Sequence, residues 1–421
     1  MARNEAGWRA AWSLALACGC GSGSAAAPTG RDAGRSASMD ATSALDATAT
    51  DASGDDGAAR DDDASPPLYE GGLAWDGCAS TGTCPPVVAS VLASGQASPG
   101  GIAVDATSVY WVNLGMLADG GVDGGGDAGP VRAGSQIMKC AKAGCGGRPT
   151  VLAEGGWDGM SKLAVDATSV YWLTTGQVLA CPLDGCAGPP RVVWSGTDAL
   201  YDIAVDSTGV YFTVPALGQL LVCPGTGCTG NPTPLWPQQF NDSGLFLSGS
   251  PGGIALDATN VYFLSNAAYA CDKANCGGTI RRVASSPASG FLGQIAVDDA
   301  NVYVTNFDTA AAGGIFWAPK ASSDQSLSVL LQGLSEPTAI AADGAGLYFS
   351  EEGSPEAGIS GFGRLGVCAA TGCGNRATTL AGFVNYPLGV AVDTTRVYWT
   401  DFGAGTDPAQ TDAGRVMARA K

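Results

Sequence analysis

The residues best suited to chemistry are cysteines that come in close pairs. Twelve of the 14 cysteines form such pairs, five with the pattern CxxxxC and one with a single residue more. The pairs are Cys78 with Cys84, Cys140 with Cys145, Cys181 with Cys186, Cys223 with Cys228, Cys271 with Cys276, and Cys368 with Cys373. Local pairs suit disulfides in an oxidising compartment. Zinc binding is the alternative, but no second pair or histidine lies near in sequence to complete a fourfold site.

The chain has 421 residues and no histidine. This composition excludes Ser-His-Asp and Cys-His nucleophiles, histidine general bases and the commonest transition-metal ligand. An enzyme would have to use carboxylates and amides around a hard cation such as Ca²⁺. The weak candidates for such a metal site are Asn113, Asn306, Glu351 and Asp401, which close four of the seven Tyr-containing segments. We predict no cofactor, with Ca²⁺ as the alternative.

These candidates belong to a frame of twelve residues that recurs along the chain. "IAVDATSVYWVN" at 102 to 113 returns as "LAVDATSVYWLT" at 163 to 174, and five further copies follow. One aspartate marks each copy: Asp105, Asp166, Asp206, Asp257, Asp298, Asp343 and Asp393. The intervals between these aspartates are 61, 40, 51, 41, 45 and 50 residues, and periods of this size indicate a repeat array or propeller.

Each copy predicts a tight β-hairpin. "IAVD" and "VYWVN" are short, rich in β-branched and aromatic residues, and separated by about three residues. We expect the aspartate to accept backbone N–H groups in the turn, a structural role rather than catalysis. A third and a fourth strand follow, such as those at 135 to 140 and 148 to 155. The sequence therefore predicts an all-β, seven-bladed β-propeller of four-stranded antiparallel blades, with six blades as the alternative.

The two ends of the repeat region complement each other. The last unit stops at Lys421 after three strands, whereas "PPVVASVLASG" at 85 to 95 has the form of a fourth strand. We predict that this N-terminal strand completes the last blade, which would remove two exposed sheet edges.

The hairpin pattern resembles the YWTD and NHL families of β-propellers over roughly residues 85 to 421, and residues 398 to 401 spell YWTD outright. The resemblance implies a propeller domain, which we place at 73 to 421. Those families usually have six blades, whereas seven hairpins occur here. Propellers resembling calcium-dependent lactonases place acids and asparagines around the central channel, so a lactonase-like hydrolase is the alternative function.

The N-terminus has the features of an export signal. Arg3 and Arg9 precede the apolar run "AAWSLALA" in residues 1 to 20, and no apolar run reaches the ~18 residues needed to span a bilayer. "LALAC" resembles the lipobox of bacterial lipoproteins, which implies lipidation of Cys18, or of Cys20 as the fallback. An ordinary cleaved signal is the alternative. Residues 21 to 72, rich in Ala, Asp, Ser and Gly, predict a disordered acidic tether.

The net charge of −18 opposes nucleic-acid binding, because such a field repels phosphate backbones. Aromatic residues ahead of the repeats are candidates for a binding face, or for filling gaps between blades: Trp157, Tyr201, Phe291 and Tyr386. The favoured function is a monomeric, non-catalytic module that binds a protein or glycan. We expect it to be exported as a lipoprotein of the outer membrane or cell surface, touching the membrane only through its anchor, or to be secreted if not lipidated.

Overall fold

The structure is a computed structural model that describes residues 89–117, 132–157, 159, 162–236, 252–285, 291–307, 313–323, 325–352, 362–369, 372–403 and 414–421. The expected signal at 1–20, the tether at 21–72, both lipidation candidates and the Cys78–Cys84 pair lie outside these residues. Within the described ranges, no helix is long and apolar enough to cross a membrane.

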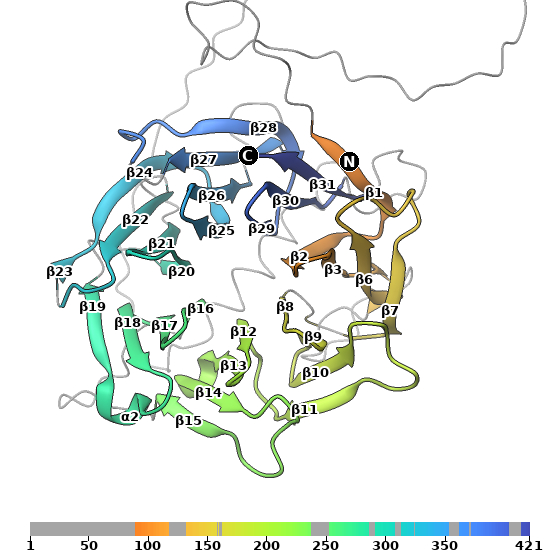
Figure 1. Cartoon of the computed structure of the whole chain (residues 1–421), viewed down its shortest axis with the longest axis horizontal. Helices are drawn as coiled ribbons and strands as arrows, with labels where there is room; N and C mark the ends of the chain where they lie inside the picture. The colour runs from red at the N-terminus through yellow and green to blue at the C-terminus, as the bar shows by residue number, and fades with distance from the viewer. Residues whose placement is uncertain are drawn as a thin grey trace, which may run out of the picture. The chain divides into compact units, whose positions relative to one another are not determined.

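Seven four-stranded antiparallel blades form a ring (Figure 1). The strands of blades 1 to 4 are β2 (Pro99–Val104), β3 (Ser108–Asn113), β6 (Ser135–Ala141) and β7 (Thr150–Gly155); β8 (Leu163–Val165), β9 (Ser169–Leu173), β10 (Gln177–Pro182) and β11 (Arg191–Ser195); β12 (Ile203–Asp206), β13 (Gly209–Val214), β14 (Gln219–Cys223) and β15 (Thr233–Trp236); and β16 (Ile254–Leu256), β17 (Asn260–Leu264), β18 (Ala267–Asp272) and β19 (Arg281–Ser285). The strands of blades 5 to 7 are β20 (Phe291–Val297), β21 (Asn301–Phe307), β22 (Gly313–Pro319) and β24 (Ser328–Leu334); β25 (Pro337–Asp343), β26 (Gly346–Glu351), β27 (Phe362–Ala369) and β28 (Thr378–Asn385); and β29 (Val390–Val392), β30 (Arg396–Asp401), β31 (Gly414–Ala420) and β1 (Ser90–Gln96). The predicted seven-bladed propeller is confirmed, and the six-bladed alternative is wrong.

A few short elements decorate the ring. They are the hairpin β4 (Met116–Leu117) with β5 (Arg132–Ala133), the 3₁₀ helix η1 (Pro215–Leu217), the helix α2 (Cys276–Thr279) and the strand β23 (Gln325–Ser326). β23 pairs in parallel with the outer strand of blade 4.

The alternation of the repeat explains the packing between blades. Successive side chains of a strand point to opposite faces, so Val109 and Trp111 pack against blade 7, whereas Tyr110 and Val112 pack against blade 2. Each of the seven interfaces between blades has its own hydrophobic cluster. The first strand of every blade lines the centre of the ring (Figure 1). The "VYW" strand is therefore buried on both faces, which is why it is almost wholly apolar.

The N-terminal strand pairs with the last blade. β1 runs antiparallel to β31, with Ser90 opposite Ala418 and Gln96 opposite Gly414. Leu92 is 6% exposed and lies in the cluster between blades 7 and 1. The dependence of the ring's stability on this strand stays a prediction.

Every outer strand carries a β-bulge at an apolar residue, and β1, β24 and β28 have a second register shift. The shared bulge lies at Leu92, Leu152, Val193, Leu235, Val283, Leu330 and Leu380. A bulge bends a strand and interrupts its ladder, which makes an exposed edge a poor template for another chain.

The two sides of the ring differ in what they carry. Strands one and two of each blade are joined by the aspartate turns, and strands three and four mostly by the cysteine loops, so both connections lie on one side. We call this side the turn face. The opposite side, where strands two and three and successive blades are joined, is the loop face.

Candidate functional site

The repeated aspartates of the turn face hold their own hairpin turns. Asp105 Oδ1 accepts the backbone N–H groups of Thr107 and Ser108, both at 2.7 Å. Its Oδ2 accepts the hydroxyl proton of Tyr110 at 2.7 Å. The other six aspartates also accept backbone N–H groups of their turns. The predicted structural role of these aspartates is confirmed.

These contacts separate the pKa values of the two partners. Burial raises the pKa of Asp105, but the hydrogen bonds from Tyr110 and the turn outweigh it and leave the pKa below its ordinary value. Burial, together with the hydrogen bond to Asp105, raises the pKa of Tyr110 above its ordinary value. The aspartate is therefore a stable anion and its tyrosine partner a neutral donor at pH 7.

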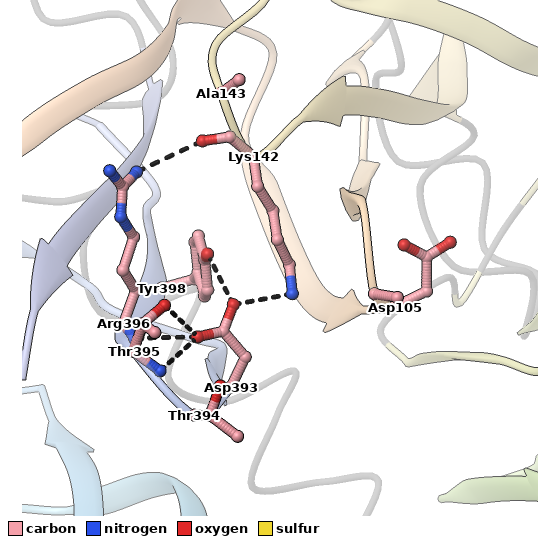
Figure 2. Close-up of a pocket in the computed structure, with 9 residues that line it drawn as sticks. Asp105, Lys142, Ala143, Asp393, Thr394, Thr395, Arg396 and Tyr398 are labelled. Carbon is pink, nitrogen blue, oxygen red and sulfur yellow. Dashed lines mark hydrogen bonds and ion pairs between the residues drawn. The ribbon is translucent and has the colours of Figure 1, made fainter.

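At some junctions a lysine from the neighbouring blade also contacts the turn aspartate and its tyrosine partner. Figure 2 shows this arrangement at the junction of blades 7 and 1. Lys142 Nζ lies 2.6 Å from Asp393 Oδ2, which also accepts the Tyr398 hydroxyl at 2.8 Å. The ammonium lies 5.7 Å from the centre of the Tyr398 ring. Arg396 Nη1 donates to the Lys142 carbonyl at 3.2 Å, across an open hollow that Asp105 also lines.

The same ion pair between a lysine and the turn aspartate of the preceding blade, which we call the lysine latch, recurs at three other junctions. Lys320 Nζ is 2.9 Å from Asp257, and the remaining pairs are Lys273 with Asp206 and Lys421 with Asp343. Burial works against ionisation of Asp257 and Asp393, yet the lysine and turn hydrogen bonds hold both pKa values far below the ordinary range. Sequence reasoning missed this latch, although lysine at one repeat position after the third strand was its signal.

Five of the six predicted disulfides lie among the described residues and are confirmed. Their Cα–Cα distances are between 4.8 and 5.3 Å. Their loops dock on the bulge of the preceding blade: the N–H of Cys186 donates to Leu152 O at 2.9 Å, and that of Cys228 to Val193 O at 3.0 Å. Blade 5 has no cysteine pair, and Ser322 Oγ donates to Val283 O at 3.2 Å instead.

On the loop face, the metal candidates lie on four different blades at the ends of β3, β21, β26 and β30. Glu351 pairs with Arg364 and accepts the N–H of Ser335 at 2.9 Å. Asp401 lies 2.6 Å from Arg415.

The two asparagines among the metal candidates differ in their contacts. Asn113 bonds to the side chains of Trp111 and Gln96, each at 3.1 Å, and Asn306 is buried. No group of three or more cysteine or acidic side chains in the described part of the chain is gathered as a metal site requires.

The aromatic candidates have different surroundings. Trp157 packs on Trp172 with ring centres 5.3 Å apart, as expected of an aromatic that fills a gap between blades. The Tyr201 hydroxyl accepts a hydrogen bond from Gln294, and the side chain of Phe291 lies outside the described residues. Tyr386 is 39% exposed and adopts φ = 46°. Its backbone lies in the left-handed region that non-glycine residues seldom occupy.

One repeat position on the loop face forms a ring around the channel. It directly precedes each "IAVD"-type segment, and its seven residues are Gly101, Lys162, Asp202, Gly253, Gln294, Ala339 and Gly389. Lys162 Nζ donates to Gln294 Oε1 at 2.8 Å, which joins blades 2 and 5. Gln294 Nε2 in turn donates to the Tyr201 hydroxyl at 3.3 Å. Burial and then the Asp202 charge raise the pKa of Tyr201 to about 12, so its hydroxyl is neutral at pH 7.

Asp202 is the buried acid of this ring, with 7% of its surface exposed. Its Oδ1 accepts the N–H of Ile203 and its Oδ2 that of Ile254 on the next blade, both at 2.9 Å. Burial raises the pKa of Asp202, and the Lys162 charge and the two backbone bonds partly oppose that rise. Sequence reasoning missed this ring, because its signal is visible only when the seven copies are aligned by position.

Buried hydroxyls hold the backbone of the ring residues. Thr400 Oγ1 accepts the N–H of Gly389 at 3.0 Å and donates to Gly100 O on blade 1 at 2.7 Å. The equivalent pairs are Asp202 with Thr213, Gln294 with Thr305, and Ala339 with Ser350, at 2.8 to 3.2 Å. The polar side chains of the ring therefore project from a rigid backbone.

No family model matches the chain, and no curated protein matches it. Solved structures of similar fold include U3-55K, with a TM-score of 0.51 and 10% identity over 79% of this chain and 98% of that chain. The WD40 repeats of RRP9 give a TM-score of 0.51 and 10% identity over 79% and 97%. A nidogen/laminin complex gives 0.43 and 19% over 56% and 86%. The likeness shows the fold alone.

Proposed function

We propose that the chain is an exported, envelope-tethered β-propeller that binds a protein or glycan on its loop face without catalysis. The observation that carries the proposal is Tyr386, an aromatic residue 39% exposed in the connection between β28 and β29 on the loop face. Its φ of 46° recurs at Ser98 and Glu336, which also precede a proline at or just before a first strand, so the exposed ring is what distinguishes this position. An exposed tyrosine offers a flat apolar face and a polar tip, which suits a sugar ring or a peptide.

The use of charge on the loop face supports binding rather than chemistry. Glu351 and Asp401 are paired with arginines, and Asp202 is bonded to two backbone N–H groups. A general base or metal ligand must offer a free lone pair to its substrate or ion. These three acids are already used within the fold.

The proposal includes a repeat of the YWTD/NHL type. Each residue of the signature has a separate structural contact: Tyr398 bonds to Asp393, Trp399 is 1% exposed, Thr400 links blades 7 and 1, and Asp401 pairs with Arg415. These contacts give a physical reason for that order of residue types.

Binding on the loop face is tested with Tyr386→Asn, because asparagine tolerates a left-handed backbone. The wild type and variant are compared by interferometry against panels of immobilised glycans and envelope proteins. Tyr348→Phe, on the turn face, is the matched control. A ligand held by wild type and control but lost by Tyr386→Asn supports the proposal, and a ligand held equally by all three proteins contradicts the assigned face.

Export and anchoring are tested by labelling cells with palmitate. We expect label on the protein and its recovery in the envelope, both lost in Cys18→Ala and retained in Cys20→Ala. The reverse pattern would move the anchor to Cys20. Unlabelled protein in the medium would replace the lipoprotein by a secreted propeller.

The hydrolase alternative is tested by melting residues 73–421 first in EDTA and then in Ca²⁺. A cation held only by the native state raises stability by about 2.7 kcal/mol at a hundredfold excess over its Kd. A non-catalytic module should melt at the same temperature in both. An upward shift together with calcium-dependent lactone hydrolysis would replace the proposed function.

A further inference from the structure

The ring at the channel mouth has three polar and four small residues. Lys162, Asp202 and Gln294 come from blades 2, 3 and 5, whereas Gly101, Gly253, Ala339 and Gly389 come from blades 1, 4, 6 and 7. The Lys162 ammonium borders a hollow of about 60 Å³, which is lined by Lys162, Gln294, Gly101, Ala339 and Gly389.

Among the residues that the structure describes, the Lys162 ammonium has one hydrogen-bond partner. An ammonium has three donors, and one of them is used in the 2.8 Å bond to Gln294 Oε1, a neutral acceptor. Asp202 acts on Lys162 through its charge, but both of its oxygens are bonded to backbone N–H groups. An anion that enters the hollow can accept charge-assisted hydrogen bonds from the ammonium donors that Gln294 does not use.

We infer that the hollow binds the carboxylate of a small organic acid, with Lys162 as its counter-ion. The volume admits a group of about that size, since one water occupies ~30 Å³ of liquid. Ile102, Leu388 and Val390 give the hollow apolar walls that suit the carbon attached to a carboxylate. A phosphate needs more donors than one ammonium supplies, so the singly charged carboxylate fits better.

This inference goes beyond the proposed function, because it concerns the channel and not the surface around Tyr386. The two are separated by their variants: loss of the loop-face ligand in Tyr386→Asn leaves the channel site intact. Failure of carboxylate binding likewise leaves the glycan or protein ligand untouched.

The test measures binding of acetate, propionate, butyrate and galacturonate to the full chain by calorimetry and thermal shift. Propionamide and inorganic phosphate are the comparison probes. We expect saturable binding of the short carboxylates at one site, and at least tenfold weaker binding in Lys162→Met, because a bond to a charged group contributes that much. Lys139→Met is the matched control, since the Lys139 ammonium donates to Leu183 O at 2.9 Å on the turn side and should leave binding unchanged.

A second variant protects the test against misfolding of Lys162→Met. Gln294→Glu places a carboxylate of the same shape beside the ammonium, so this variant should melt at a higher temperature and lose the response to added carboxylates. Stronger binding of galacturonate than of butyrate would identify a sugar acid as the source of the carboxylate, and the reverse a free short-chain acid. The inference is overturned if no carboxylate binds, if propionamide or phosphate binds as well, or if both variants respond like the wild type.

Discussion

The two faces of the propeller are built on opposite principles. On the turn face the same aspartate turn occurs seven times, and among the described residues four lysine–aspartate pairs and five disulfide loops contact the neighbouring blade. On the loop face the seven equivalent positions around the channel differ, and three of them form one polar cluster. Repetition therefore marks the part that maintains the ring, and departure from repetition marks the part available for a ligand.

The comparison also separates two uses of charge. Turn-face carboxylates are anions held by hydrogen bonds within their own turn and, at four junctions, by a lysine. On the loop face the Lys162 ammonium bonds to an amide, and the nearby Asp202 is held by backbone N–H groups. Mutations on the turn face should therefore affect stability, and mutations on the loop face should affect binding.

The largest loss should follow removal of the strand that completes blade 7. Deleting residues 73 to 96 removes β1 and exposes β31 and the core beneath Leu92, so we expect loss of the cooperative melt. The point variant Leu92→Ala should cost about 2–5 kcal/mol, as for buried leucines in general. Val91, its neighbour on the same bulge, is 51% exposed, and Val91→Ala should cost less than about 0.5 kcal/mol. Equal melting of the two point variants, or a deletion that melts like the wild type, would contradict this role for β1.

The next effect should come from a single disulfide. Replacing Cys181 and Cys186 together by serine opens a six-residue loop, which costs about 2 kcal/mol in loop-closure entropy. The loop also loses its rigid dock on Leu152 of blade 1. Chemical denaturation of the oxidised protein measures the cost, and a thiol count after denaturation without reductant gives the control. In the wild type we expect almost no free thiols apart from Cys18 and Cys20. Twelve further free thiols in the wild type would contradict the disulfides.

The sequence predicted the turn face far better than the loop face, and the reason is distance along the chain. Aspartate turns and disulfides join residues within six positions of each other, the strands of each hairpin are neighbours in the sequence, and this pattern is repeated. Lys162 and Gln294 are 132 positions apart and meet only because the ring closes. The spacing of residues within one repeat therefore cannot predict that contact. The lysine latches also join different blades. Lys142 and Asp393 are far apart in the sequence, so the sequence alone does not indicate that they form an ion pair.

A smaller effect is expected for one latch, and it should depend on pH. Lys142→Met removes the partner of Asp393 and should cost about 1 kcal/mol at pH 7. The pKa of Asp393 is lowered in the folded state, so its contribution is complete above the unfolded value of about 3.9 and is lost as the pH falls through the folded value. Stabilities of variant and wild type should therefore converge below pH 4. Lys139→Met is the control, because its acceptor is a carbonyl and its cost should not change with Asp titration.

The smallest effect on stability should come from replacing Tyr386. The same replacement should have the largest effect on binding of the loop-face ligand. Asparagine relieves the left-handed strain at φ = 46°, so Tyr386→Asn should leave stability unchanged or raise it by up to about 1 kcal/mol. Denaturant unfolding measures this change, and the ligand panels measure the loss of binding. A variant that gains stability and loses its ligand would show that the strained tyrosine is kept for recognition. A variant that loses stability would instead show that Tyr386 stabilises the fold. The loop face would then not differ from the turn face at this position.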